Sequence, residues 1–316
     1  IFLIAAFVYG MTIEPTASFW DCPEFISCAE KLQVGHPPGA PFYMLVGNLF
    51  TQFASDAKSV SYMVNFLNAL LSAGCILFLF WSITRLVRSL ITSDKEITSD
   101  KEKLSVTDFV IILGSGVVGA LAYTFSDTFW FSAVEGEVYA FSSFLTALVF
   151  WMIFRWQDEA DSVSGDRWII LIAYIIGLSI GVHLLNLLCI PAIVLVFYYR
   201  KYQVTSLKGV IGAITLSGLL IVLILFIYIP GMADVGEWFE LLFVNVLGFP
   251  FQSGLVTFLF LVFALLAGAI YRFRKRVIHT VLCCILMLTA GYTTYAVILI
   301  RANANTPLNE NAPDNI

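Results

Sequence analysis

Long apolar segments separated by short polar ones make up most of this chain. A helix needs about 20 predominantly apolar residues to cross a bilayer, and several segments come close to or exceed that length. We predict clear membrane spans at Val60–Val87, Phe109–Phe125, Glu137–Trp156, Gly209–Ile229, Leu255–Tyr271 and Val277–Ile300. The pattern therefore predicts an all-α polytopic membrane protein.

Four other segments do not fit a single crossing. Ile1–Met11 is short, and we interpret it as the trailing part of a first span; Ala40–Ala54 is interpreted as an interfacial or re-entrant helix. Trp168–Tyr199 is too long for one crossing and just long enough for two short ones that meet near His183. We expect Pro230–Gln252 to be a loop.

Composition agrees with this pattern. The chain is 59% hydrophobic and 12% charged, and its mean hydropathy is +0.89, which is too apolar for a soluble domain. The sequence opens inside an apolar run with Ile1. We expect residues 1–316 to form one transmembrane domain in the N-terminal part of a longer protein.

Lysine and arginine are concentrated in four of the polar segments. Loops 85–108, 155–167, 200–208 and 271–276 hold 5, 2, 3 and 4 of them, which is 14 of the chain's 17. The positive-inside rule places these loops in the cytosol. The first includes a linker at 91–107, where the hexapeptide ITSDKE occurs twice in succession. We expect this linker to be a solvated loop.

The opposite face carries the most unusual polar segment, the outer loop 12–43. It holds four acidic residues and one of the chain's three histidines. So many ionisable groups beside a bilayer are unusual in a chain this apolar, and such groups usually mark function. We therefore interpret the segment as an active-site loop.

Asp21 and Glu24, in the motif WDCPEF, are the leading candidates within that loop. Pro23 suits the first turn of a helix, so Asp21 is a natural N-cap with Glu24 in the first turn. On the motif alone, capping is the favoured interpretation. The neighbouring acids and histidine favour a second one, because carboxylates at a partly dry surface gain the proton affinity that a general base requires.

His36 lies in the motif GHPPGAP. Pro37 and Pro38 restrict the backbone and predict a stiff, extended turn. A histidine held by such a turn can hydrogen-bond a phosphate or a carboxylate. The structural and the functional interpretation of His36 both remain open at this point.

A second group of candidates follows Trp130, where Glu135 precedes a predicted span and Glu137 is the first residue of that span. A helix N-terminus favours negative charge, so capping explains Glu135 by itself. Glu137 lies deeper, and buried acids of this kind usually face a protein-lined or wet cavity. Their neighbourhood makes Trp130 and Glu137 substrate-site candidates.

His183 and Asn186 are three residues apart and are predicted to share a helix face inside an apolar region. A hydrogen bond between helices is the favoured explanation. A polar substrate site at the helix break is the alternative.

Several motifs together resemble a known family. They are WDCPEF, GHPPGAPFY, EVY after a Trp-containing turn, GLSIGVHLLN and the ending IRANANTPLNENAPDN. Over essentially all 316 residues, the chain is similar to the bacterial branch of the family that includes the vertebrate protein O-mannosyltransferase acting on plexin-type receptor domains. That family belongs to the GT-C glycosyltransferases. It often has Gly or Gly-Gly before the Asp, where this chain has Phe19 and Trp20.

The resemblance implies a GT-C-like transmembrane helix bundle with a functional first outer loop. It implies polyprenyl-phosphate mannose as the donor and Ser or Thr hydroxyls of exported proteins as acceptors, with no further cofactor and no nucleic acid. It also implies the bacterial inner membrane as the location, with the active-site loop on the periplasmic side.

Carried onto this sequence, the resemblance makes Asp21 the leading base candidate and Glu24 the second, in a displacement that inverts the anomeric carbon. The leaving phosphate needs a positively charged donor. We choose Arg301, at the end of the last span, with His36 and His183 as auxiliaries. The remaining substrate-binding candidates are Asn186, Glu137 and Trp130. We assign no metal ligands.

Two alternatives stay open. A transporter or lipid-handling protein would use the acids as a proton relay and the break at His183 as a substrate site, although the sequence shows no matching halves. A GT-C enzyme that glycosylates a glycolipid would keep the fold and change the acceptor.

Overall fold

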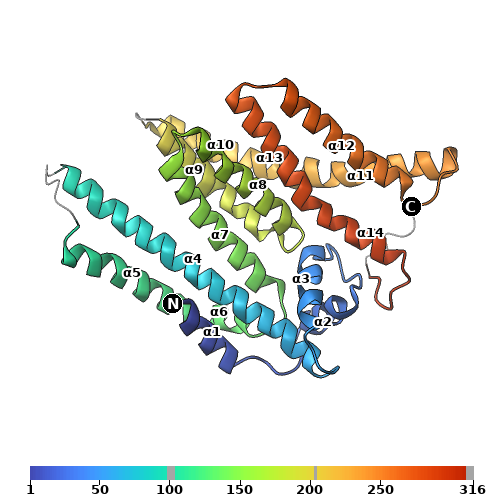
Figure 1. Ribbon diagram of the computed structural model, residues 1–316, viewed down its shortest axis with the longest axis horizontal. Coiled ribbons are helices and arrows are strands. Elements are labelled where there is room, and N and C mark those ends of the chain that lie inside the picture. The colour runs from blue at the N-terminus through green and yellow to red at the C-terminus, as the bar shows by residue number, and fades with distance from the viewer. Residues whose placement is uncertain (98–103, 203–204, 311–316) are drawn as a thin grey trace. The chain divides into compact units, whose positions relative to one another are not determined.

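The computed structural model describes residues 1–97, 104–202 and 205–310. Within these ranges the chain is helical, apart from loops and one isolated β-bridge between Val34 and Asn309. The α-helices, drawn in Figure 1, are α1 (Phe2–Met11), α2 (Cys22–Lys31), α3 (Pro41–Thr51), α4 (Ser59–Ile97), α5 (Val106–Thr124), α6 (Asp127–Ala133), α7 (Val138–Glu159), α8 (Asp166–Ile180), α9 (Ile190–Lys201), α10 (Leu207–Leu223), α11 (Ile229–Leu241), α12 (Ser253–Arg272), α13 (Arg276–Tyr292) and α14 (Ala296–Ala302).

Seven helices in the described residues are long and apolar enough to cross a membrane. The protein is therefore an all-α polytopic membrane protein, as the hydrophobic pattern predicts. The expected break near His183 is confirmed, because α8 ends at Ile180 and a 3₁₀ turn, Leu184–Cys189, precedes α9. The short apolar segment after His36 is the short helix α3.

The prediction of a loop at Pro230–Gln252 is wrong. Residues Leu207–Val246 form one 40-residue run of helix, and only the last few residues of the expected loop are non-helical. A proline lacks an N–H and clashes with the carbonyl one turn earlier in a regular α-helix. Here a wider π-helical turn, Ile224–Tyr228, lies directly before Pro230 and accommodates it.

Two shorter polar segments also differ from expectation. The first ITSDKE copy, Ile91–Glu96, belongs to α4, which extends to Ile97, so this half of the expected linker is helical. The second copy lies outside the described residues, except for Ile97. The Trp-containing turn before the EVY motif contains the short helix α6.

The chain divides into two compact units, and all eight predicted site residues lie in the first. This unit consists of Ile1–Arg155, Ser179–Asn186 and the described residues of Thr294–Ala312. Within it α4 and α5 run side by side (Figure 1). A side chain at Gly116 of α5 would collide with α4, so the glycine permits this close packing.

A hydrophobic cluster joins α1 to α4, α5 and α6 in the first unit. Tyr9 is fully buried at its centre and packs edge-on against Phe129, while its hydroxyl donates to the Thr124 carbonyl at 3.0 Å. The other buried members are small or aliphatic, among them Ala5, Ala69, Ala73, Ile76 and Ala120. This cluster fixes α1 beside the long helix that supports the outer loops.

The second unit comprises Trp156–Leu178 and the described residues of Leu187–Thr293. Within it α8 and α13 approach through glycines. A side chain at Gly177 would run into the backbone of Leu288, and one at Gly291 into that of Gly177 and Leu178. Small residues at such contacts let membrane helices pack backbone to backbone.

Candidate active site

Asp21 occupies the N-cap position of α2, and Pro23 lies in the first turn, as the sequence predicts. The Asp21 side chain nevertheless makes no capping hydrogen bond and is exposed. The preceding Trp20 has a φ of 64°, in the left-handed region that favours glycine, at the position where the resembled family often has Gly. The capping interpretation of Asp21 is therefore wrong, and its carboxylate is open to a substrate.

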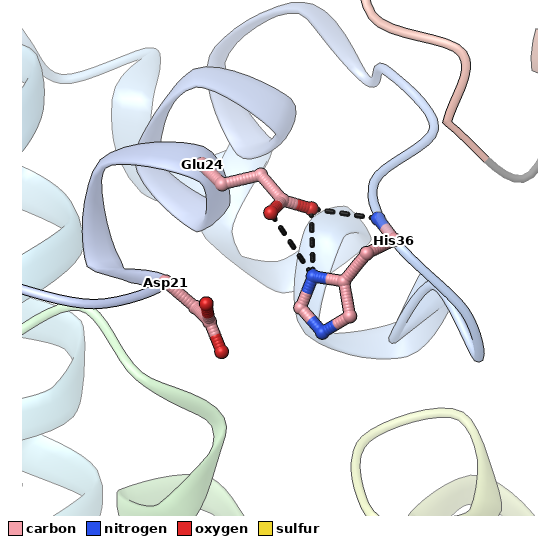
Figure 2. Close-up of side chains that lie close together, drawn as sticks. All are labelled: Asp21, Glu24 and His36. Atoms are coloured by element: carbon pink, nitrogen blue, oxygen red, sulfur yellow. Dashed lines mark hydrogen bonds and ion pairs between the residues drawn. The ribbon is translucent and has the colours of Figure 1, made fainter.

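The Glu24 side chain accepts hydrogen bonds from His36 rather than from the backbone of its own helix (Figure 2). Both of its carboxylate oxygens lie within hydrogen-bond distance of His36 Nδ1, at 2.9 and 3.0 Å, and one also accepts from the His36 backbone N–H at 2.7 Å. Gly35 makes this approach possible, because a Cβ there would collide with the Glu24 carboxylate. The stiff turn thus holds His36 against a carboxylate, which is one of the two partners that the sequence leaves open.

The contact with Glu24 shifts the pKa of His36. The hydrogen bond that His36 donates to Glu24 raises the pKa of His36 above its usual value, and the negative charges of Glu24, Asp21 and Glu310 add to the effect, while partial burial opposes it. The side chain is 38% exposed, so the ring is not sealed from solvent. His36 therefore keeps its positive charge to a higher pH than a free histidine.

Asp21, Glu24 and His36 form one cluster. One oxygen of each carboxylate and one ring nitrogen of His36 all lie within 4.8 Å of one another, and Figure 2 shows the Asp21 carboxylate facing the Glu24–His36 pair with no hydrogen bond drawn to either residue. Carboxylate oxygens and an imidazole nitrogen can hold a divalent cation. With no cation, the same three groups place an accessible carboxylate next to the ring of a histidine whose pKa is raised.

The loop before α7 brings Glu137 toward this cluster. Asn68 of α4 donates through Nδ2 to the carbonyls of Glu135 and, at 2.8 Å, of Glu137. Glu137 is 6% exposed and lies one residue before the span. The pKa of Glu137 is raised to about 7, chiefly by burial; the charges of Asp21 and Glu135 also raise it, while the hydrogen bond from the Val138 N–H and the charge of His36 lower it. Glu137 is therefore partly protonated at neutral pH and lies within electrostatic reach of the cluster.

Asn65, one turn before Asn68 on α4, fixes the other side of the site. Its Nδ2 donates to the carbonyl of Glu14 at 2.6 Å and to that of Thr16 at 2.9 Å. The Glu135 carboxylate accepts a hydrogen bond from Ser18, so Glu135 tethers this loop and does not cap α7 as expected. A sequence signal for the two asparagines exists, since they lie three residues apart in an apolar span where a polar residue usually has a protein partner.

Arg301 lies at the other end of α2 from Asp21. Its Nε donates to the carbonyl of Leu32 at 2.7 Å and its Nη2 to that of Lys31 at 3.0 Å. Because α2 is 10 residues long, its two ends are separated by about 15 Å. Arg301 also lines a small hollow whose other residues are Leu32, Gln33, Gly39, Pro41, Met44, Val297 and Ile298.

Trp130 is a residue of α6 and packs against the hydrophobic cluster that includes α1. Its ring nitrogen donates to the Thr12 hydroxyl at 2.9 Å, and its ring packs edge-on against Tyr9. Trp130 therefore fastens the start of the outer loop to α6.

His183 and Asn186 make separate contacts. His183 lies in the break before the 3₁₀ turn, where Nδ1 accepts from the Leu185 N–H at 3.1 Å and the ring lies 5.4 Å from that of Tyr139. The prediction that His183 and Asn186 share a helix face is wrong. His183 lies in the non-helical break after α8, and the 3₁₀ turn that contains Asn186 begins at Leu184. Asn186 is fully buried and accepts from Thr146 of α7 at 3.2 Å, which is the bond between helices favoured from the sequence.

Comparison with known families gives these residues a context. Residues 21–206 match the family described as Protein O-mannosyl-transferase TMEM260 N-terminal domain, a match over more than half of the chain. The chain belongs to this family. The region matched by the TMEM260 N-terminal domain begins at Asp21 and includes the whole cluster, and Arg301 lies beyond it.

Two curated relatives are similar to the chain. "Protein O-mannosyl-transferase tmem260" of Dictyostelium discoideum is 25% identical over 242 residues, which is 72% of this chain and 27% of the relative. "Protein O-mannosyl-transferase TMEM260" of Mus musculus is 24% identical over 208 residues, which is 65% of this chain and 26% of the relative. The chain thus spans about a quarter of the length of the curated relatives it matches. No solved structure matches the chain.

Proposed function

We propose that this chain is the transmembrane catalytic part of a GT-C-like glycosyltransferase. It transfers mannose from a polyprenyl-phosphate donor to Ser or Thr hydroxyls of exported proteins, at the periplasmic face of a bacterial inner membrane. Two curated relatives that are similar to the chain over 242 and 208 residues are named protein O-mannosyl-transferases. The observation that carries the proposal is the exposed carboxylate of Asp21 beside the bonded Glu24–His36 pair, in the first outer loop.

Asp21 is the base in this mechanism. Its carboxylate takes the proton of the acceptor hydroxyl, and the oxygen attacks the anomeric carbon of mannose. The bond from that carbon to the phosphate oxygen breaks, and polyprenyl phosphate leaves with the electron pair. One displacement from the face opposite the leaving group inverts the anomeric configuration. Asp21 is better placed than Glu24, whose oxygens already accept N–H groups of His36.

His36 supplies positive charge for the leaving phosphate. Glu24 engages Nδ1, so Nε2 is the ring nitrogen that remains for a substrate. An imidazolium N–H donates a charge-assisted hydrogen bond to a phosphate oxygen, and this bond strengthens as negative charge develops there. Glu137 is buried and partly protonated, so it can donate to a sugar hydroxyl.

The test is a transfer assay on the purified full-length protein in lipid nanodiscs. Radiolabelled polyprenyl-phosphate mannose is supplied with Ser- and Thr-containing acceptor peptides, and NMR gives the anomeric configuration of the product. We expect label on the peptide with inverted configuration. Retention of configuration would rule out the single displacement. Transfer to glycolipid alone, or uptake by proteoliposomes with no transfer, would support the alternative functions instead.

A further inference from the structure

The end of the described chain is fastened to the segment that leads from α2 to the active-site cluster. Arg301, in the last turn of α14, donates to the carbonyl of Lys31, the last residue of α2, and to that of the C-cap residue Leu32. Helix ends leave such carbonyls without helical partners, and a cation there is also favoured by the helix dipole. The guanidinium therefore both bonds to this end of α2 and neutralises it.

A second set of bonds follows directly along the chain. The Val34 N–H donates to the carbonyl of Leu308 at 3.1 Å, and the Glu310 N–H donates to the carbonyl of Val34 at 3.0 Å. Gln33 completes the link, because its Oε1 accepts from the Leu308 N–H and its Nε2 donates to the carbonyl of Ser27 in α2. Residues 308–310 thus lie along Gln33 and Val34 like a short parallel strand.

Apolar burial supports the same arrangement. Val34 is 1% exposed and packs with Ile298 and Ala302 of α14, which are 6% and 1% exposed. Val34 is followed by Gly35, whose close approach to the Glu24 carboxylate leaves no room for a side chain. A shift of Val34 would therefore be passed through Gly35 to His36.

We propose that Arg301 is a positioning residue: by tying α14, and with it residues 308–310, to the end of α2, it holds His36 against Glu24. The effect of Arg301 on catalysis, which is part of this inference, rests on the proposed function. Arg301 acts through this segment, about 15 Å of helix away from Asp21, and not as the ligand of the donor phosphate that the sequence suggests. Its planar fork suits two neighbouring carbonyls in a way that a lysine ammonium does not.

The decisive variant is Arg301→Gln in the full-length protein in nanodiscs, and the first readout is the NMR titration of His36, assigned with His36→Gln. The direction in which the pKa of His36 changes separates a positioning role of Arg301 from the simple effect of a nearby positive charge. Removing a nearby cation by itself raises the pKa of a histidine, whereas loosening His36 from Glu24 lowers it. We expect Arg301→Gln to lower the pKa of His36. Lys31→Gln is the matched control, because it removes an exposed cation at the same helix end and should not lower it.

Two further readouts complete the test. Hydrogen exchange, measured without substrate, should become faster in residues 31–36 and 303–310 of Arg301→Gln. In the transfer assay kcat should fall about tenfold to a hundredfold, the scale of a misplaced catalytic group, with little change in KM for the donor. Gln33→Leu, which breaks the same link without touching Arg301, should change all three readouts in the same direction.

The opposite pattern overturns the proposal. If Arg301→Gln leaves the pKa of His36 and the exchange of both segments as in the wild type while KM for the donor rises, Arg301 binds the donor phosphate. If none of the readouts changes, Arg301 has no positioning role. The titration and exchange measurements need no substrate, so they decide the role of Arg301 even if the wild-type protein shows no mannose transfer.

Discussion

The carboxylate of Glu24 accepts hydrogen bonds from both the backbone N–H and the ring Nδ1 of His36, twelve residues further along the chain. This double contact fixes the orientation of the ring and leaves Nε2 for a substrate. It also leaves Asp21, three residues before Glu24, as the carboxylate of the cluster without such an engagement. The division of roles that we propose for the two acids of this motif rests on this contact.

The first prediction concerns pH. Because Glu24 raises the pKa of His36, the imidazolium survives to a higher pH than a free histidine, and activity that needs the cation is lost as pH rises through that raised value. Glu24→Gln should lower the pKa of His36 and move the alkaline limb of the kcat/KM profile to lower pH. Glu30→Gln, on the same helix, is the control and should leave the limb in place. If the alkaline limb does not move in Glu24→Gln, the Glu24–His36 pair does not control the pH dependence of catalysis.

The second prediction uses the steric requirement at Gly35. A Cβ at this position would collide with the Glu24 carboxylate. Gly35→Ala should therefore displace Glu24 from His36 and reduce transfer at least about tenfold, the effect of misplacing a catalytic group. Gly10→Ala in α1 is the control, since nothing lies within 4 Å of a Cβ there. Equal activity of the two variants would contradict the close approach of Gly35 to Glu24.

The third prediction concerns the support from α4. Asn68→Ala removes the donor that holds the carbonyls of Glu135 and Glu137. Leaving buried acceptors unsatisfied should destabilise the protein by about 1–3 kcal/mol, seen as a lower midpoint of thermal unfolding, and should reduce transfer. Ser72→Ala, on the same helix, is the control, because the buried Ser72 hydroxyl has no hydrogen-bond partner in the described part of the chain. If both variants melt at the same temperature, the Asn68 bonds do not stabilise the site.

The predictions from sequence succeeded where the signal was local or strongly apolar. The spans follow from apolar length, and Asp21, Glu24 and His36 come from one short loop, so their proximity could be anticipated. The pairing of Glu24 with His36 could not, because the motif around Asp21 and Glu24 fits helix capping equally well. Which acid is engaged depends on how the Gly35 turn folds back on α2.

Other features depend on contacts distant in sequence. The docking of residues 308–310 on Val34 has no periodic pattern to reveal it. The two bonds of Arg301 reach across 269 and 270 residues. Pro230 suggests a loop because proline breaks a regular helix. A π-helical turn in front of it keeps the helix intact, and no local residue pattern that we recognised distinguishes the two outcomes.

The fourth prediction concerns membrane topology, on which the lipid-donor mechanism depends. Single cysteines at two exposed positions, Ala17→Cys in the outer loop and Thr107→Cys at the start of α5, should be labelled from opposite sides of the membrane in a background without native cysteines. The positive-inside rule places Thr107 in the cytosol. Labelling of both positions from one side would overturn the orientation, and with it the periplasmic site.

The most direct test of the account is the rate of mannose transfer by Asp21→Asn, measured beside Glu30→Gln in the same nanodiscs. An amide keeps the shape of the Asp21 side chain and cannot accept the acceptor's proton. We predict that Asp21→Asn keeps the wild-type melting temperature and loses transfer, while Glu30→Gln retains both. A turnover of more than about a tenth of the wild-type rate in Asp21→Asn, equivalent to a barrier change below about 1.4 kcal/mol, would contradict the assignment of Asp21 as the base.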